Sequence, residues 1–153
     1  VGEIGTVTVT SVINPDVAEN KAYPTLVALT SSVSAVSTTT TSDITATYAV
    51  TVASYYGANY YYIDGSRAAT LNLSEGSIYR FAQSDSSNNN HPLRFSTTSD
   101  GTHGGGSEYT TGVTINGTPG YAGAYTQIEV ASGAPTLYYY CTNHSGMGGQ
   151  INT

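Results

Sequence analysis

Charged side chains are scarce in this sequence. Asp, Glu, Lys and Arg make up 9% of the 153 residues, against about 25% in an average soluble domain. The formal net charge is −6, and the only four basic residues are Lys21, Arg67, Arg80 and Arg94. Nucleic-acid binding needs clustered cations that neutralise phosphates. Four scattered cations therefore exclude nucleic acid as a partner.

Other absences narrow the class of protein further. The single cysteine, Cys141, excludes an internal disulfide. No apolar run approaches the roughly 20 residues that a transmembrane helix needs. Runs of Lys, Glu, Leu and Ala that would build surface helices are also missing. We therefore expect an all-β protein without a membrane span, made of one domain with or without an extra arm.

The residues that replace charge are Thr, Ser, Gly, Asn and Tyr, which suit half-buried strands and tight turns. Apolar and polar positions alternate in residues 48–52 and again in residues 125–130, as they do in strands. Asp64-Gly65, Glu75-Gly76 and Asn116-Gly117 are turn signals. Strands about eight to twelve residues apart with turns between them predict a β-sandwich or barrel.

Residues 1–46 differ from the rest. Threonine alternates with valine in residues 6–10, and no charge falls between Lys21 and Asp43. This segment is either one or two strands of the sandwich or an extended arm that packs on a neighbouring subunit. We therefore divide the chain into a Thr/Ser-rich strand or inter-subunit arm, 1–46, and a β-sandwich, 47–153.

The C-terminal run TLYYYCTNHSGM carries the strongest chemical signal. Strand alternation places Cys141 at the inner end of a strand, and His144 and Met147 follow at intervals of three in a glycine-containing loop. Such a loop can fold back so that thiolate, imidazole and thioether converge. These ligands suit copper, and a second imidazole would complete a trigonal His₂Cys set with a weak axial Met.

Two other histidines can supply that imidazole. His91 starts a strand-like segment, and His103 lies in a glycine-rich loop. A strand terminus fixes a ligand better than a loop does, which favours His91 and leaves His103 as a solvated loop residue. Arg94 lies three residues after His91. Its charge would disfavour a metal if it pointed inward, but a strand residue can equally point outward.

Three segments together resemble the cupredoxin family, in particular plastocyanin and amicyanin. Residues 137–151 resemble the copper loop, 69–81 the strand, glycine turn and strand before the first His ligand, and 91–95 that first-His segment. The resemblance covers about residues 48–153. It implies a Greek-key β-sandwich that binds copper, with His91, Cys141 and His144 as equatorial ligands and Met147 as the axial ligand.

Residues 91–120 and 138–149 are also similar to a domain of structural proteins in marine tailed phages, especially those of cyanobacteria. This resemblance implies a capsid-decoration, tail or fibre module at a virion surface. Its partners would be other copies of the chain or neighbouring subunits. Alternating tyrosines in residues 55–64 are expected to form a contact face for such neighbours.

Two functions follow as hypotheses. The first is a structural β-sandwich module of a virion or other extracellular assembly, with a blue-copper-like metal site. The alternative is a soluble type 1 copper electron-transfer protein that meets a redox protein, for example in a periplasm. We do not expect an enzyme, because a nucleophilic cysteine needs a base and an oriented third group, and no other residues suggest a substrate pocket.

Overall fold

The computed structural model of the protein describes residues 43–153, which form ten β-strands and two short 3₁₀ helices. In chain order the elements are β1 (Ile44–Tyr55), β2 (Ala58–Ile63), β3 (Ser66–Arg67), β4 (Leu71–Asn72), β5 (Ile78–Ala82), η1 (Ser86–Asn88), β6 (Leu93–Ser96), η2 (Gly101–Gly104), β7 (Val113–Asn116), β8 (Tyr125–Glu129), β9 (Leu137–Cys141) and β10 (Gly149–Asn152).

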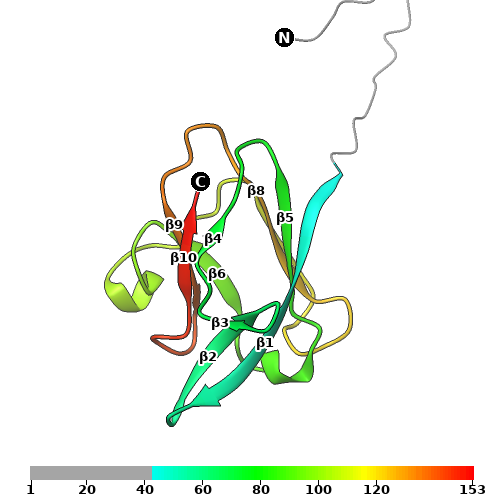
Figure 1. Ribbon diagram of the computed structural model, residues 1–153, viewed down its shortest axis with the longest axis vertical. Helices are drawn as coiled ribbons and strands as arrows, with labels where there is room; N and C mark the ends of the chain where they lie inside the picture. The colour runs from blue at the N-terminus through cyan, green and yellow to red at the C-terminus, as the bar shows by residue number, and fades with distance from the viewer. Residues whose placement is uncertain (1–42) are drawn as a thin grey trace, which may run out of the picture. The chain divides into compact units, whose positions relative to one another are not determined.

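The strands form two sheets that pack as a sandwich (Figure 1). One sheet has the order β3-β2-β1-β5-β8-β7 and the other the order β4-β10-β9-β6. Both are mixed, because β1 runs parallel to β5 and β4 runs parallel to β10. The expected all-β sandwich is confirmed, and its Greek-key connectivity stays a prediction.

The sandwich begins with β1 at Ile44. This strand contains the last three residues of the segment 1–46, and it pairs with β5 from Ile44 onward. The predicted strand or arm in residues 1–42 lies outside the described residues.

Two of the predicted turns connect strands of the sandwich as expected. Asp64 and Gly65 have φ angles of 46° and 81° and join β2 to β3 as a tight hairpin, in keeping with the left-handed conformation such a turn requires. The turn at Gly76 separates two short strands as expected. Those strands, β4 and β5, belong to different sheets, so this turn carries the chain from one layer of the sandwich to the other.

Aromatic rings fill the space between the sheets. Phe81 is fully buried, with its ring centroid 5.3 Å from those of Tyr48 and Phe95 and 6.4 Å from that of Tyr139. The alternation expected in β8 is confirmed, since Thr126 and Ile128 are buried. The core thus joins strands of both sheets around one ring.

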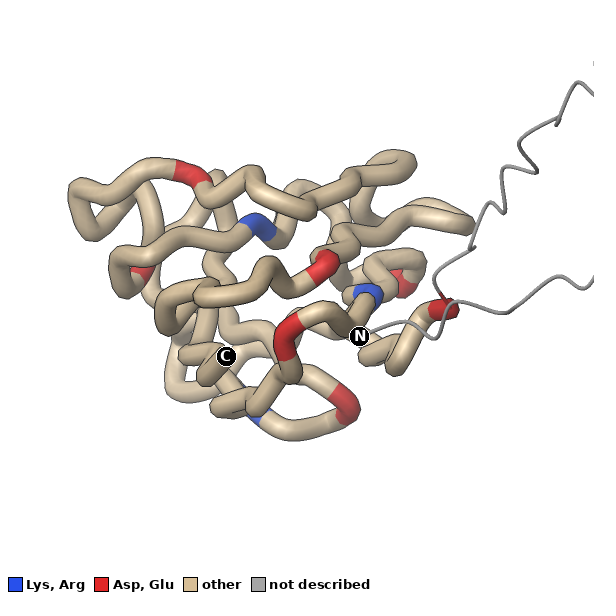
Figure 2. The backbone as a smooth tube through the Cα atoms, turned by 90° about the horizontal axis from the view of Figure 1, so that it is seen from above, with Lys and Arg blue, Asp and Glu red and all other residues tan. Residues whose placement is uncertain are grey.

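Charged residues are thinly spread over this scaffold (Figure 2). Within residues 43–153, no helix is long and apolar enough to cross a membrane.

Replacing Phe81 by Ala should lower the free energy of unfolding by about 3–5 kcal/mol, because it removes a buried ring and leaves a cavity. Urea unfolding of the metal-free protein measures the change. As a control, Ile115→Thr alters a side chain that is 46% exposed and should shift the value by less than about 0.5 kcal/mol. Equal effects of the two substitutions would contradict the assigned core.

Candidate metal centre

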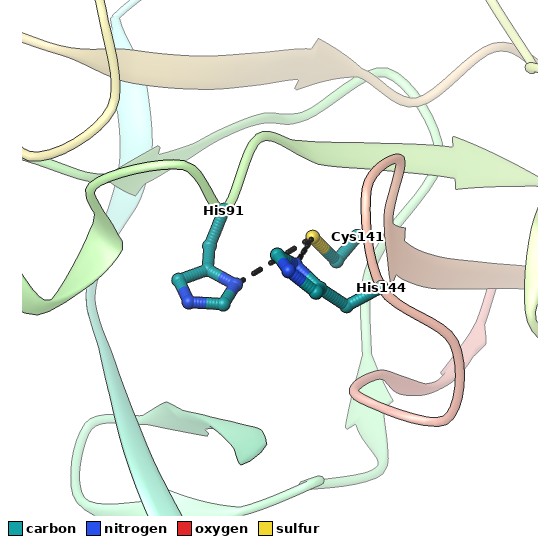
Figure 3. Close-up of side chains that lie close together, drawn as sticks. All are labelled: His91, Cys141 and His144. Atoms are coloured by element: carbon teal, nitrogen blue, oxygen red, sulfur yellow. Dashed lines mark hydrogen bonds between the residues drawn. The ribbon is translucent and has the colours of Figure 1, made fainter.

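His91, Cys141 and His144 converge at one pole of the sandwich (Figure 3). The Sγ atom of Cys141 lies 3.8 Å from Nδ1 of His91 and 3.6 Å from Nδ1 of His144. The ligand atoms of all three residues lie within 4.8 Å of one another. The structure therefore brings together three of the four residues that the sequence predicts as ligands, and this cluster could hold a metal ion.

Strand pairing brings the first two residues together. β6 pairs with β9 in antiparallel register, with Leu93 opposite Cys141. His91 precedes Leu93 by two positions, and Pro92 between them accepts a hydrogen bond from the Thr142 amide at 3.2 Å. Because a residue before proline is held in an extended conformation, His91 lies at the end of the ladder beside the thiol.

The polar loop before His91 has a defined conformation. Asp85 caps η1 by accepting a hydrogen bond from the Ser87 amide at 2.9 Å. Asn90 has a φ of 61°, a left-handed conformation that Asn adopts more readily than most residues. The His91 amide donates to the Asn88 carbonyl at 2.8 Å. The sequence SDSSNNN thus folds into a short turn that delivers His91 to the site.

A buried polar network fixes the backbone around His91. The side-chain amide of Gln83 donates to the His91 carbonyl at 2.8 Å, and its oxygen accepts from the Leu93 amide at 3.2 Å. The Tyr61 hydroxyl donates to the same His91 carbonyl at 2.8 Å. Gln83 is 1% exposed and Tyr61 is fully buried. These bonds compensate the backbone polar groups that strand pairing leaves free on either side of Pro92.

Asn88 extends this network into the sheet. Its side-chain amide donates to the Val50 carbonyl of β1 at 2.7 Å, and its oxygen lies 3.3 Å from the Gln83 amide nitrogen. Asn88 is fully buried. The loop that carries His91 is therefore attached to the six-stranded sheet through a satisfied polar contact.

The loop that carries His144 is tied down on two sides. The Asn143 side-chain amide donates to the Asn90 carbonyl and side-chain oxygen at 3.0 and 2.8 Å. The Asp100 carboxylate accepts from the Gly146 amide at 2.9 Å. At Gly148, a Cβ atom would collide with the Tyr139 carbonyl. Glycine is therefore required where the loop passes back over β9.

His103 contacts the site in a way that the sequence did not indicate. Its Nε2 atom lies 3.0 Å from the carbonyl oxygen of Cys141, so the Nε2–H form donates to the backbone of a candidate ligand. The ring is exposed, as expected of a solvated loop residue, and it has this backbone partner in addition. The sequence could not predict this contact, because His103 and Cys141 are 38 positions apart and come together only in the folded chain.

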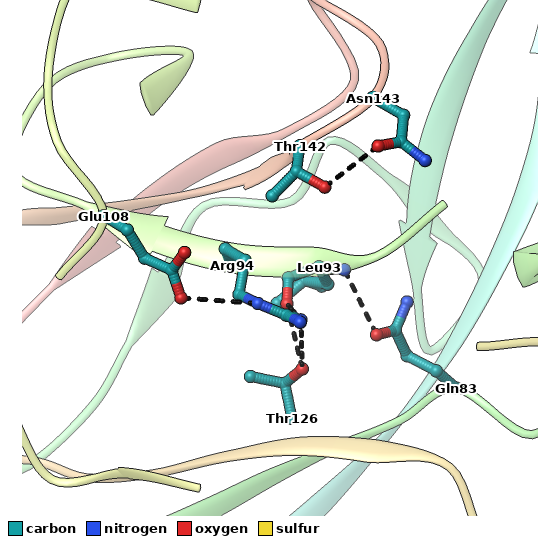
Figure 4. Close-up of polar contacts among 7 residues, drawn as sticks. All are labelled: Gln83, Leu93, Arg94, Glu108, Thr126, Thr142 and Asn143. Atoms are coloured by element: carbon teal, nitrogen blue, oxygen red, sulfur yellow. Dashed lines mark hydrogen bonds and ion pairs between the residues drawn. The ribbon is translucent and has the colours of Figure 1, made fainter. Parts of the chain in front are cut away.

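Arg94 contacts Glu108 and Leu93 (Figure 4) and lies on the face of β6 opposite to the Leu93–Cys141 pair. Its Nε atom lies 3.3 Å from a Glu108 carboxylate oxygen, and a terminal nitrogen donates to the Leu93 carbonyl at 2.8 Å. On β6, Arg94 pairs with Tyr140 and Leu93 pairs with Cys141. Because side chains alternate along a strand, Arg94 is on the opposite face of the sheet from Cys141. The sequence allowed Arg94 to point toward the cluster or away from it, and the structure shows the second orientation. The carboxylate of Glu108 offsets the charge of Arg94.

Burial affects the protonation of His91. The side chain is 9% exposed, and this burial lowers the pKa of His91, with a smaller lowering from the neighbouring His144. The neutral imidazole is therefore favoured. That is the form in which a histidine nitrogen can bind a metal.

The two sulfur–nitrogen separations fit coordination of a common metal. With sulfur about 2.3 Å and nitrogen about 2.0–2.1 Å from a metal, angles of about 109–120° separate the two atoms by about 3.5–3.8 Å. The observed separations are 3.6 and 3.8 Å. A thiol has one proton and can donate to only one of the imidazoles, whereas a cation satisfies both nitrogens and the sulfur together. No carboxylate belongs to the cluster, which disfavours calcium and magnesium.

Met147 follows the cluster at the end of the same loop and is fully buried. It also lines an open depression beside His144, together with His103, residues 57–59 of the β1–β2 hairpin and residues 143–145. His144 is the most exposed of the three clustered residues, and Cys141 is fully buried. The assignment of Met147 as an axial ligand stays a prediction.

No family model matches this chain, and no curated protein matches it either. The class that the fold and the site define is thus an all-β sandwich with a His/Cys/His cluster at one pole.

Replacing Gln83 by Met, which has a similar size, should lower the free energy of unfolding by about 1–3 kcal/mol, because the buried Leu93 amide loses its partner. It should also weaken metal binding, since His91 loses part of its backbone support. Chemical unfolding and metal titration measure the two effects. The control Gln127→Met removes a half-buried glutamine of β8 whose side-chain oxygen accepts from Arg80 of β5, and it should leave metal affinity unchanged. Equal loss of metal affinity in both variants would argue against the role of Gln83.

Proposed function

We propose that this protein is a copper-binding β-sandwich module, with His91, Cys141 and His144 as ligands and Met147 as a weak axial ligand. The observation that carries the proposal is the convergence of two Nδ1 atoms on one buried sulfur. Copper suits a thiolate with two imidazoles in both of its oxidation states, and it binds such sites more tightly than other divalent first-row metals do.

The residues of the chain contribute preorganisation. Gln83 and Tyr61 hold the His91 backbone, and Asn143 and Asp100 hold the loop of His144. Little ordering is therefore left for the binding step, which raises affinity. Full burial of the Cys141 sulfur excludes water and competing thiol reagents from the ligand that matters most.

We further propose that the module is structural, in a virion or other extracellular assembly. The low charge and the Thr, Ser, Gly and Tyr content of the sequence support this setting. Metal binding would join two segments fifty positions apart and would thereby stabilise the folded state.

Adding Cu(II) to the purified full-length protein should give an intense thiolate charge-transfer absorption that saturates at one equivalent. Cys141→Ser should abolish this band, and His91→Ala should abolish or strongly shift it. The control His103→Ala keeps all proposed ligands and should retain the band. A wild-type protein without the band, or a Cys141→Ser variant that keeps it, would falsify the copper assignment.

Copper should also stabilise the folded protein. At a free metal concentration of about 100 times the dissociation constant, the free energy of unfolding should rise by about 2.7 kcal/mol. Thermal or urea unfolding with and without metal measures the increase, and Cys141→Ser serves as the control without it. The structural role is contradicted if copper binds but leaves the unfolding transition unchanged.

Electron transfer is the second candidate, and the exposure of His144 favours it. A ligand that reaches the surface beside an uncharged depression offers a route between a bound metal and a partner. Stopped-flow reduction of the copper protein would separate the candidates: rapid electron exchange with a small redox protein, lost when the depression is blocked by Asn59→Trp, supports a carrier. Exchange no faster than that of a buried site supports the structural role.

A further inference from the structure

The tip of the β1–β2 hairpin carries a tyrosine where the turn disfavours one. β1 ends at Tyr55 and β2 begins at Ala58, which leaves Tyr56 and Gly57 as a two-residue loop with φ angles of 47° and 83°. Asn, Asp or Gly is preferred at such positions, and left-handed backbone costs other residues about 1–2 kcal/mol. Tyr56 is 93% exposed, so packing within the described residues offsets little of this cost. Strain of this kind is typical of functional positions.

The aromatic tip is also held in place. The guanidinium carbon of Arg67 lies 3.5 Å from the ring centroid of Tyr55, and the ring of Tyr56 meets that of Tyr55 edge-on, with centroids 4.5 Å apart. A ring that is already positioned loses little conformational entropy when it is buried by a partner. Rigid tyrosines are accordingly enriched among the residues that dominate protein interfaces.

This convex tip adjoins the concave part of the surface. Gly57, the residue after Tyr56, lines the depression beside His144, as do Ala58 and Asn59. None of the lining residues is an Asp, Glu, Lys or Arg. The hairpin and the ligand loop lie at the same end of the sandwich (Figure 1), which therefore presents a projecting ring next to a hollow that is free of Asp, Glu, Lys and Arg.

We propose that this pole is a homodimer interface, in which Tyr56 of one copy enters the depression of a second copy and the exchange is reciprocal. A two-fold interface must be complementary to itself, and a projection beside a hollow meets that condition. Copies with a net charge of −6 repel one another, and a hollow without carboxylates minimises this repulsion at the contact. The inference rests on the proposed assembly role and does not require the metal.

The area that the two rings can bury is small compared with that of stable complexes. A buried tyrosine contributes about 150–250 Å², so two Tyr56 rings supply about 300–500 Å² of the roughly 1,200 Å² or more that stable complexes bury. The surrounding hairpin and loop must supply the rest. The dimer is consequently weak in solution and strengthens when several copies are held together, as in an assembly.

Sedimentation equilibrium of the full-length protein, over micromolar to millimolar concentrations, tests the proposal. The wild type should populate a dimer. Tyr56→Asn should weaken dimerisation by at least about tenfold, while the free energy of unfolding stays equal or rises because asparagine suits the turn. Asn59→Asp, which places two carboxylates at the interface, should have the same effect on dimerisation. Ile115→Thr, on the opposite edge strand β7, should dimerise like the wild type.

Either of two outcomes overturns the proposal. A wild type that stays monomeric throughout would assign the tip to a different partner, such as another protein or a glycan. An oligomer that survives both Tyr56→Asn and Asn59→Asp would place the contact elsewhere on the chain. The copper spectrum of Tyr56→Asn separates this test from the metal proposal: an intact band with lost dimerisation supports the interface alone, and a missing band in every variant counts only against copper.

Discussion

The pairing of β6 with β9 is the constraint on which the candidate site depends. It sets Leu93 opposite Cys141 and so brings His91 beside the sulfur. A slip of one residue would turn Cys141 to the face that Tyr140 now occupies, because side chains alternate along a strand. Buried Phe95 and Tyr139 hold the register from the core side. The register that packs the core is therefore also the register that places His91 beside Cys141.

Around this pairing, hydrogen bonds hold the segments that carry His91 and His144 in place without a metal. The His91 segment is supported from the six-stranded sheet by Gln83 and Asn88. The His144 loop is supported by Asn90 and by Asp100. The arrangement combines a rigid, buried thiol with one exposed imidazole.

Much of the scaffold was predictable because it follows from periodicity and from turn residues. The alternation in β8, the Asp64-Gly65 hairpin and the inward position of Cys141 all express local rules, and the structure confirms them. The spacing of Cys141 and His144 likewise sufficed to predict their proximity. The direction of Arg94 could not be chosen, since its partner Glu108 lies on a loop beyond the strand.

The residues that support the site were not predictable in the same way. Gln83 and Asn88 belong to a polar stretch that resembles a solvated loop, yet both are buried, since their partners come from other elements. The contact of His103 with the Cys141 carbonyl was not predicted for the same reason. Tyr140, on the face of β9 opposite to Cys141, is buried because its ring packs against Gly101 of η2. Sequence patterns report which face of a strand a residue occupies, but not what later covers that face.

Full burial of the only cysteine among the 153 residues gives the protein an internal reporter of its own motion. A thiol-specific reagent can reach Cys141 only when a segment that covers it opens, such as the one that carries His91 or the one that carries His144. In the metal-free protein, the rate of modification under native conditions therefore measures how often that segment opens. No second thiol contributes to the signal, so local opening and global unfolding can be distinguished by their dependence on denaturant.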